Sequence, residues 1–252
     1  MKKFLIIIAL IFTGVCNLTA QDSLALQTDS AKNGNSMSLI ELFSIYTDIW
    51  QNVDLPMSVS YYCPGIDIYS IISLPLGNSK INFNYGLGFS MHNLRSDAMP
   101  VAEVKYDSTI SQFVETEKTI FQRIPEKVNN KEINYDINKL TLAYIDIPLE
   151  LCYKTKNKKG KVFKFAAGFK AGYLLSSHTK YKGNDITGTD KDVKYKTYRI
   201  KNIEPLKYGA TARLGYGKFD IFGYYSFSKL FKKDKGPEMY PVSVGICITP
   251  FS

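Results

Sequence analysis

The most constraining stretch of the chain is residues 140–154, LTLAYIDIPLELCYK. From Ile145 onward the odd positions are Ile, Ile, Leu, Leu and Tyr, whereas the even positions include Asp146 and Glu150. Only a β-strand separates residues with a period of two, because its successive side chains point to opposite faces. One face is therefore apolar and the other carries two carboxylates. This pattern favours a strand whose outer side contacts lipid and whose acidic side faces an enclosed interior.

The same alternation recurs along the chain. Residues 81–92 place large apolar side chains at odd positions and Asn, Gly, Ser and His at even positions. Small polar residues inside and large apolar ones outside are expected where lipid is the outer solvent. We predict eight strands, over residues 38–50, 65–76, 81–92, 140–154, 163–176, 195–216, 219–231 and 239–251. Residues 93–139 are predicted to be mostly an excursion from the barrel, and residues 180–194 a polar loop. A start of the fourth strand before Leu140 is left open.

The connections between these strands alternate in length. Those after the second, fourth and sixth strands are short, and the others are generally longer. Outer-membrane barrels have short periplasmic turns, longer surface loops and an even number of strands. The predicted fold class is therefore all-β, an eight-stranded antiparallel up-and-down transmembrane β-barrel over residues 38–252. The alternative, a soluble barrel of the lipocalin type, needs an apolar interior that the small, polar face does not provide.

The start of the chain predicts export. A basic head and an apolar run at residues 4–12 are typical of a secretory signal peptide, here residues 1–20. A lipoprotein anchor on Cys16 is the alternative, disfavoured because Val15 stands where a small residue is expected. Residues 21–37 are predicted to be a flexible periplasmic lead-in. After residue 20 no apolar run approaches the ~18 residues of a membrane helix, so any membrane-spanning segments must be strands.

The amino-acid composition and net charge indicate which kinds of partner the protein has. The chain has 45% hydrophobic and 13% aromatic residues and a formal net charge of +9, which falls to +7 without Lys2 and Lys3. This is not the composition of a disordered chain. A basic balance can indicate nucleic acid, but in an exported protein it favours lysines that meet anionic headgroups. We therefore expect the cell outer membrane as the location, and outer-membrane lipid, lipopolysaccharide and the barrel-assembly machinery as partners, without nucleic acid.

Six charged residues share the inward parity. They are Asp146, Glu150, Lys164, Lys170, Lys207 and Arg213. The interior of an eight-stranded barrel is just wide enough for side chains to fill it. Because buried charges require partners, we predict that these residues form a salt-bridged network that plugs the lumen. The alternative is a narrow ion path or proton relay.

Two histidines, His92 and His178, are predicted to lie near the rim, with Ser90 close in sequence to the first. A Ser/His pair is the minimum for acyl transfer, so a lipid-modifying enzyme is an alternative function. The sequence supplies no recognisable oxyanion hole or orienting acid for such a pair. It also contains no phosphate-binding loop or metal cluster above background. We therefore predict a non-enzymatic protein without a cofactor.

Three cysteines remain after processing: Cys63, Cys152 and Cys247. An odd number without a CxxC motif argues against a disulfide framework or a zinc site. Cys152 and Cys247 share the inward parity but fall on the fourth and eighth predicted strands, on opposite sides of the barrel. Their Cα atoms would be farther apart than the ~7 Å that a disulfide allows. We predict that all three thiols are reduced.

Several segments resemble a known family. They are the YIDIPLEL segment at 144–151, the GLG at 86–88, and the closing PVSVGI at 241–246 with Phe251. Over approximately residues 60–252 the chain resembles the Bacteroidetes outer-membrane β-barrel family that includes PorT-like proteins. The resemblance implies an eight-stranded outer-membrane barrel. Since PorT is associated with type IX secretion, it also implies a structural or accessory role in secretion or envelope assembly, with secretion-system components as partners.

Overall fold

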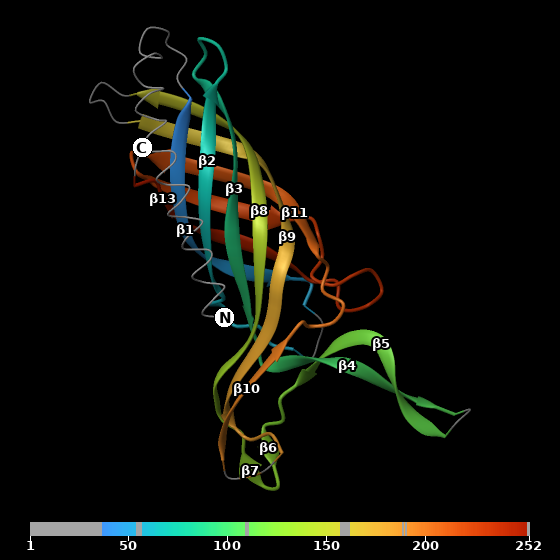
Figure 1. Cartoon of the computed structure of the whole chain (residues 1–252). Coiled ribbons are helices and arrows are strands. Elements are labelled where there is room, and N and C mark those ends of the chain that lie inside the picture. The colour runs from blue at the N-terminus through green and yellow to red at the C-terminus, as the bar shows by residue number, and fades with distance from the viewer. Residues whose placement is uncertain are drawn as a thin grey trace, which may run out of the picture.

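The computed structural model describes residues 37–53, 57–108, 111–156, 162–187, 189 and 191–250, and its main feature is a closed barrel (Figure 1). The barrel strands are β1 (Ser38–Gln51), β2 (Pro64–Pro75), β3 (Ile81–Arg95), β8 (Tyr135–Lys156), β9 (Val162–Asn184), β11 (Leu206–Tyr216), β12 (Phe219–Ser226) and β13 (Tyr240–Ile248). Each strand pairs antiparallel with the next, and β13 pairs with β1 to close the ring. The predicted eight-stranded up-and-down barrel is confirmed.

The two faces of the wall follow the alternation in the sequence. On β8, Asp146 is 0% and Glu150 5% exposed, whereas the neighbouring Ile147 is 51% exposed. The outward side chains are large and apolar on every barrel strand; Ile45 and Phe169, for example, are more than 60% exposed. Water does not favour so much exposed apolar surface on a monomer. The outer face of the barrel wall is therefore suited to an apolar environment rather than to water.

The two ends of the barrel differ. At one, the turn end, β2–β3 and β11–β12 are joined by tight turns with Gly77 and Gly217 at φ values of 60° and 64°. Glycine suits these positions because it lacks the Cβ that disfavours positive φ. At the other, the loop end, the chain makes long excursions after β1, β3, β9 and β12. Figure 1 shows β4 to β7 (residues 98–132) and the ends of β8, β9 and β10 (Asp192–Tyr198) reaching well beyond the barrel.

The predicted excursion at 93–139 does leave the barrel, but it is wrong to treat most of it as irregular loop. It contains the hairpin β4 (Ala98–Asp107) and β5 (Gln112–Arg123), the short pair β6 (Lys127–Val128) and β7 (Lys131–Glu132), and then the start of β8. β4 and β5 form a two-stranded sheet of their own, and β5 is exposed along most of its length. Since neither face is steadily buried, the sequence has no apolar alternation to reveal the strands.

The predicted loop at 180–194 is also wrong, because β9 continues to Asn184 and pairs with β10 (Asp192–Tyr198). Beyond the barrel, β8, β9 and β10 form a three-stranded extension. The sixth barrel strand begins at Leu206 rather than at 195, and the seventh ends at Ser226 rather than at 231. The predicted bounds merged barrel strands with chain that belongs to the loop end.

The start of the chain is not part of this description. The predicted signal peptide, residues 1–20, and nearly all of the lead-in at 21–37 lie outside the described residues. Within the described part, no helix is long and apolar enough to cross a membrane.

A hydrophobic core closes the loop end. Its members come from strand ends and from the excursions between them: Trp50, Met57, Cys63, Leu94, Ala98, Leu140, Leu142, Tyr144, Ile203, Leu230, Phe231 and Met239. We call this set the loop-end core. The excursions are also hydrogen-bonded to one another, for example from Thr119 N of β5 to Lys235 O at 2.8 Å. Segments far apart in sequence therefore form one packed layer over the barrel.

Candidate functional site

The middle of the lumen holds a cluster of buried charges. Lys207 Nζ lies 3.2 Å from Asp146 Oδ2, and Lys170 Nζ lies 3.8 Å from the same oxygen. Lys170 also pairs with Asp67 Oδ2 at 3.3 Å. With His92 and Asp48, described below, these residues form the central cluster. The carboxylate of Asp146, from β8, thus joins lysines from β9 and β11 across the lumen.

A second group lies nearer the turn end. Arg213 pairs with Glu150 and, through Nη1, with Asp220 Oδ2 at 3.3 Å. Lys164 Nζ lies 2.9 Å from Asp220 Oδ1. We call these four residues the turn-end cluster. Each of the six residues predicted to face the lumen therefore makes an ion pair in one of the two clusters, from strands β8, β9 and β11.

Sequence reasoning missed three of the acidic partners and the role of a histidine. Asp67 and Asp220 have the inward parity of their strands, so a full count of inward positions could have included them. Asp48 was harder to identify because apolar residues occupy both faces of β1. Without these carboxylates the predicted set contained four cations and two anions. The two clusters together contain five carboxylates, three lysines, one arginine and His92.

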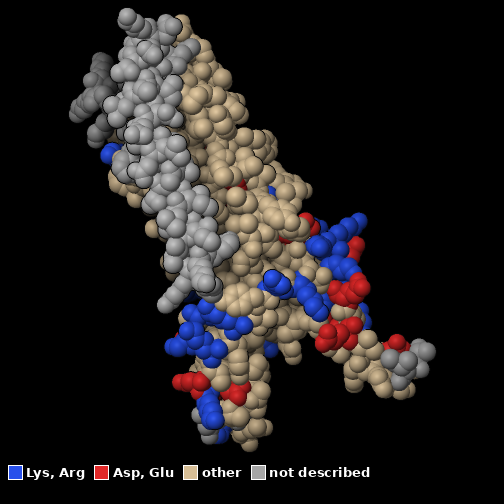
Figure 2. Space-filling model, viewed as in Figure 1, with Lys and Arg blue, Asp and Glu red and all other residues tan. Residues whose placement is uncertain are grey.

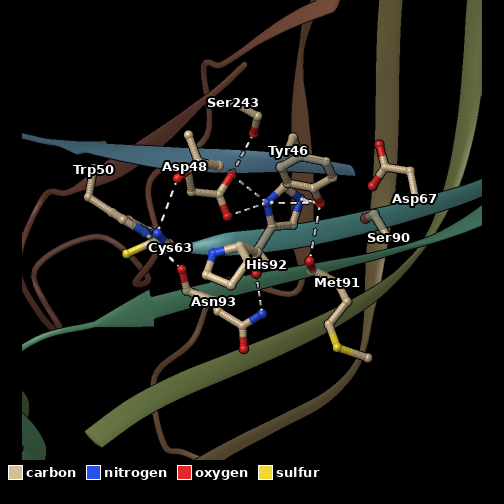
Figure 3. A network of polar contacts seen from close by, with 12 residues as sticks. Tyr46, Asp48, Trp50, Cys63, Asp67, Ser90, Met91, His92, Asn93 and Ser243 are labelled. Atoms are coloured by element: carbon tan, nitrogen blue, oxygen red, sulfur yellow. Dashed lines mark hydrogen bonds and ion pairs between the residues drawn. The ribbon is translucent and has the colours of Figure 1, made fainter. Parts of the chain in front are cut away.

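His92, which lies beside Asp48 in Figure 3, is the link between Asp48 and Lys207. Its Nδ1 lies 3.0 Å from Asp48 Oδ2, and Lys207 Nζ lies 2.9 Å from its Nε2. Since lysine can only donate, Nε2 accepts, and Nδ1 carries the proton donated to Asp48. Ser243 Oγ donates to Asp48 Oδ1 at 2.6 Å. The prediction that His92 lies at the rim is wrong: it is 1% exposed, because its strand continues past it to Arg95.

Tyrosines line the central cluster. Tyr69 OH donates to Asp146 Oδ2 at 2.7 Å. Lys207 Nζ lies 4.4 Å from the ring centroid of Tyr144, and Lys170 Nζ lies 4.3 Å from that of Tyr224. The negative face of an aromatic ring attracts a cation, and more strongly where water is excluded. Both lysines are therefore held by ring faces as well as by carboxylates.

Glycines make room for two of the carboxylates. A Cβ placed on Gly172 would overlap Asp146 Oδ1, and one on Gly215 would overlap Asp220 Oδ1. Gly172 lies opposite Asp146 in the β8–β9 register, and Gly215 opposite Asp220 in the β11–β12 register. The small inward residues of these strands are thus matched to the charges beside them.

Two small cavities lie among the lumen side chains. A cavity of ≈ 20 Å³ is lined by residues that include Asp67, Glu150, Lys170 and Arg213. A second, of ≈ 10 Å³, lies beside His92 and Lys207. A cavity needs roughly 10–15 Å³ to hold one water. The larger cavity therefore has room for about one water molecule, and Asp67 Oδ1, which has no hydrogen-bond partner in the structure, is among the groups such a water can reach.

The serines near the histidines are already engaged. Ser90 Oγ accepts a hydrogen bond from Lys207 Nζ at 2.8 Å rather than contacting His92. Ser177 Oγ accepts from Ile200 N at 3.0 Å, and the neighbouring His178 ring lies 5.5 Å from the ring of Tyr198. A nucleophile and its base must lie within hydrogen-bond reach. The geometry brings neither histidine together with a serine in that way.

The remaining candidate chemistry is limited. In the described ranges, no group of three or more His, Cys, Asp and Glu side chains is placed to hold a metal ion. Cys63, Cys152 and Cys247 are buried and free. Cys152 is on β8 and Cys247 on β13, which are four strands apart around the ring in either direction. The sequence-based argument that these two strands are opposed is therefore correct.

The comparison with protein families agrees with this architecture. A family model described as "Outer membrane protein beta-barrel domain" matches residues 51–232. Among solved structures, the chain is similar to Ail, the attachment invasion locus protein of Yersinia pestis, determined in complex with the heparin analogue sucrose octasulfate. The identity is 12%, the match covers 85% of this chain and 99% of Ail, and the TM-score is 0.24. No curated protein matches the sequence significantly.

Proposed function

Because the chain belongs to the outer membrane protein beta-barrel family, we propose that it is a non-enzymatic, closed barrel that presents a rigid loop surface outside the cell. The family and the apolar wall place the barrel in the cell outer membrane. In such barrels the tight turns face the periplasm and the long connections face outward. The loop end, with its packed core, is then the exposed surface.

The observation that carries the proposal is the bracing of the loops. Asn202, before β11, donates from Nδ2 to Glu117 O of β5 at 2.8 Å, and its own carbonyl accepts from Lys232 N, after β12, at 2.9 Å. The rings of Phe121 and Phe231 pack edge to face, 5.9 Å apart. Three excursions are thus fixed relative to one another. A surface that is ordered before a partner arrives loses less conformational entropy on binding.

The filled lumen supports the same proposal against an ion path. The central cluster crosses the barrel from β2 to β9, and the loop-end core covers it on one side. An ion path needs continuous space for water or the ion, and the two cavities hold about one water molecule each at most. The lumen charges act as a structural plug. The loop surface, rather than the lumen, is then the functional part of the protein. The PorT-like resemblance points to a role in a secretion or envelope-assembly complex.

Deletion and complementation test this role. A strain lacking the protein should lose secreted cargo or envelope components, and the intact chain should restore them. A chain in which residues 98–123 are replaced by a short Gly/Ser linker should insert into the membrane but fail to restore the phenotype. Normal complementation by the hairpin-deleted chain would contradict the assignment of the braced loop surface as the functional part.

The enzymatic alternative has its own test. His178→Ala removes a partly exposed ring and should leave both barrel assembly and the lipid profile unchanged. His92→Ala is less informative because the His92 side chain is buried and its loss removes a partner from both Asp48 and Lys207. A changed lipid A or phospholipid profile in a well-assembled His178→Ala barrel would establish a lipid-modifying enzyme in place of the proposed role.

A further inference from the structure

Four cations lie side by side on the outside of the barrel, just beyond its apolar wall. Arg95 of β3 pairs in register with Lys139 of β8, Lys139 with Lys180 of β9, and Lys180 with Lys196 of β10. We call these four residues the cationic row. Like charges directly opposite each other on neighbouring strands destabilise a sheet. The row therefore opposes folding unless a negative charge lies against it.

Arg95 and Lys139 have the outward parity of their strands, and Lys180 shares their face because of a β-bulge in β9. Ala143 pairs with Ser176 but Tyr144 with Leu174, so β9 has one extra residue there. The insertion reverses the parity of β9: beyond it, Ser177 and Tyr181 are buried while Lys180 lies on the other face. Figure 2 shows Lys and Arg gathered where the barrel wall gives way to the β8–β9–β10 extension.

Among the residues that the structure describes, carboxylates do not neutralise the row. In the described part of the chain, no Asp or Glu forms an ion pair with any of its four members, whereas nearby Lys182 pairs with Asp136 at 2.5 Å. Lys139 Nζ donates to Asn93 Oδ1 at 2.9 Å, and the guanidinium carbon of Arg95 lies 5.9 Å from the ring centroid of Tyr62. Arg95 Nε has no hydrogen-bond partner.

Burial and the positive charge of the row lower the pKa of two titratable groups. The pKa of Lys139 is lowered by burial and then by the charges of Arg95, Lys180 and Lys196. The pKa of His178, two residues before Lys180 on β9, is lowered by burial and then by Lys196, Lys139 and Lys180. Carboxylates are not among the causes in either case. A local excess of positive charge is the condition under which an external anion binds.

The height of the row identifies the anion's source. On β9 the outward apolar residues end at Tyr173 and Leu175, and Lys180 lies five residues further along the strand. At ~3.3 Å per residue and a tilt of ~40°, the row lies roughly 12 Å beyond the apolar band. Long Lys and Arg side chains extend their charges back toward the interface. The cations therefore reach the level of outer-leaflet headgroups and the sugars attached to them.

We propose that the cationic row is a binding site for the phosphate groups of anionic glycolipids in the surrounding outer leaflet. The site lies on the lipid-facing side of four adjacent strands, and its charge complements a phosphorylated headgroup. A bound phosphate places negative charge between side chains that otherwise repel one another. This site goes beyond the proposed role of the loops, because it binds the membrane rather than a protein partner.

The test compares two double variants of the full-length chain. Lys180→Gln/Lys196→Gln removes two members of the row. The matched control, Lys105→Gln/Lys118→Gln, removes two lysines from the β4–β5 hairpin. Each folded protein in phosphatidylcholine nanodiscs is titrated with purified lipopolysaccharide. Since a lysine near an anionic surface contributes about 1 kcal/mol, affinity should fall roughly fivefold per lysine, or about 25-fold in the row variant, and should change little in the control.

A second readout guards against a folding defect. In neutral detergent without lipopolysaccharide, the row variant should melt at the same or a higher temperature than the wild type, because the repulsion is relieved. With lipopolysaccharide present it should melt at a lower temperature than the wild type. Unchanged affinity in the row variant, or an equal loss in the control variant, would overturn the proposal. So would stronger binding of soluble dextran sulfate or inorganic phosphate than of bilayer-anchored lipopolysaccharide.

Discussion

The central cluster and the loop-end core are adjacent layers of one barrel, held together by different forces. The central cluster joins charges such as Asp146 and Lys207 whose side chains are almost fully buried. The loop-end core packs apolar residues such as Leu94 and Leu142, which are 0% and 1% exposed. A buried ion pair is stable only while both partners are present, whereas an apolar core loses free energy in proportion to the volume removed.

The difference explains why each layer is where it is. In the middle of the wall every residue is fixed by the ladder of two neighbouring strands, so charges can be placed to within hydrogen-bond distance of one another. At the loop end the backbone is less regular, and non-directional apolar packing tolerates imprecise positions better than charge pairing does. Inside the barrel the middle of the strands therefore carries the charges, whereas the strand ends and the excursions carry the apolar residues.

The largest effect is expected from Asp146→Ala, which leaves Lys207 and Lys170 without a shared carboxylate. Breaking a buried pair by removing one partner costs about 3–5 kcal/mol. The temperature at which the heat-resistant folded form is lost on gel electrophoresis should fall sharply. Asp136→Ala is the control, because that carboxylate pairs with Lys182 in the exposed extension. Equal melting of the two variants would show that the central cluster is solvated.

Leu142→Ala should have the next largest effect, but at the loop end. Removing a fully buried leucine side chain costs about 2–5 kcal/mol, depending on how far the cavity collapses. Because the loop-end core holds the excursions together, we expect faster proteolysis of the loops at a temperature where the barrel remains folded. Leu149→Ala on the outward face is the control. Faster loop cleavage in Leu149→Ala than in Leu142→Ala would contradict this separation of the two layers.

Glu150→Ala should destabilise the barrel less than Asp146→Ala does. Arg213 loses one carboxylate but keeps Asp220 at 3.3 Å, so the remaining charge is still partly compensated. We expect a loss of about 1–3 kcal/mol, the range for an unsatisfied buried group. Melting of the folded form measures it, with the exposed Glu126→Ala as the reference. A loss as large as that of Asp146→Ala would mean that Asp220 does not support Arg213.

The smallest effect concerns the thiols. Cys152 and Cys247 should be alkylated separately after denaturation without reductant, because opposed strands keep them apart. Cys247 Sγ instead accepts a hydrogen bond from Ser44 Oγ at 3.2 Å. Mass spectrometry of the alkylated peptides is the measurement. A crosslinked pair of these peptides would require a different strand order and would remove the basis for comparing the two layers.

The lumen residues could be predicted because strand periodicity is visible in the sequence. Asp146, Lys170 and Lys207 each occupy the small, polar parity of a strand whose other face is apolar. The loop-end core could not be predicted in the same way. Met57, Ile203 and Phe231 lie outside the barrel strands, so no local pattern marks them as buried. They become a core because barrel closure brings distant excursions together.

By itself the sequence determined that this chain forms an eight-stranded barrel with an apolar outer face and charges inside, since alternation with a period of two decides which face each residue occupies. Only the tertiary structure decided the partners of those charges. The link from Asp48 through His92 to Lys207 joins β1, β3 and β11, and its geometry depends on registers around the whole ring. Lys180 joined Arg95 and Lys139 on the outward face through a single bulge that reversed the parity of β9. Periodicity is a local property, whereas register and bulges are set by contacts between strands.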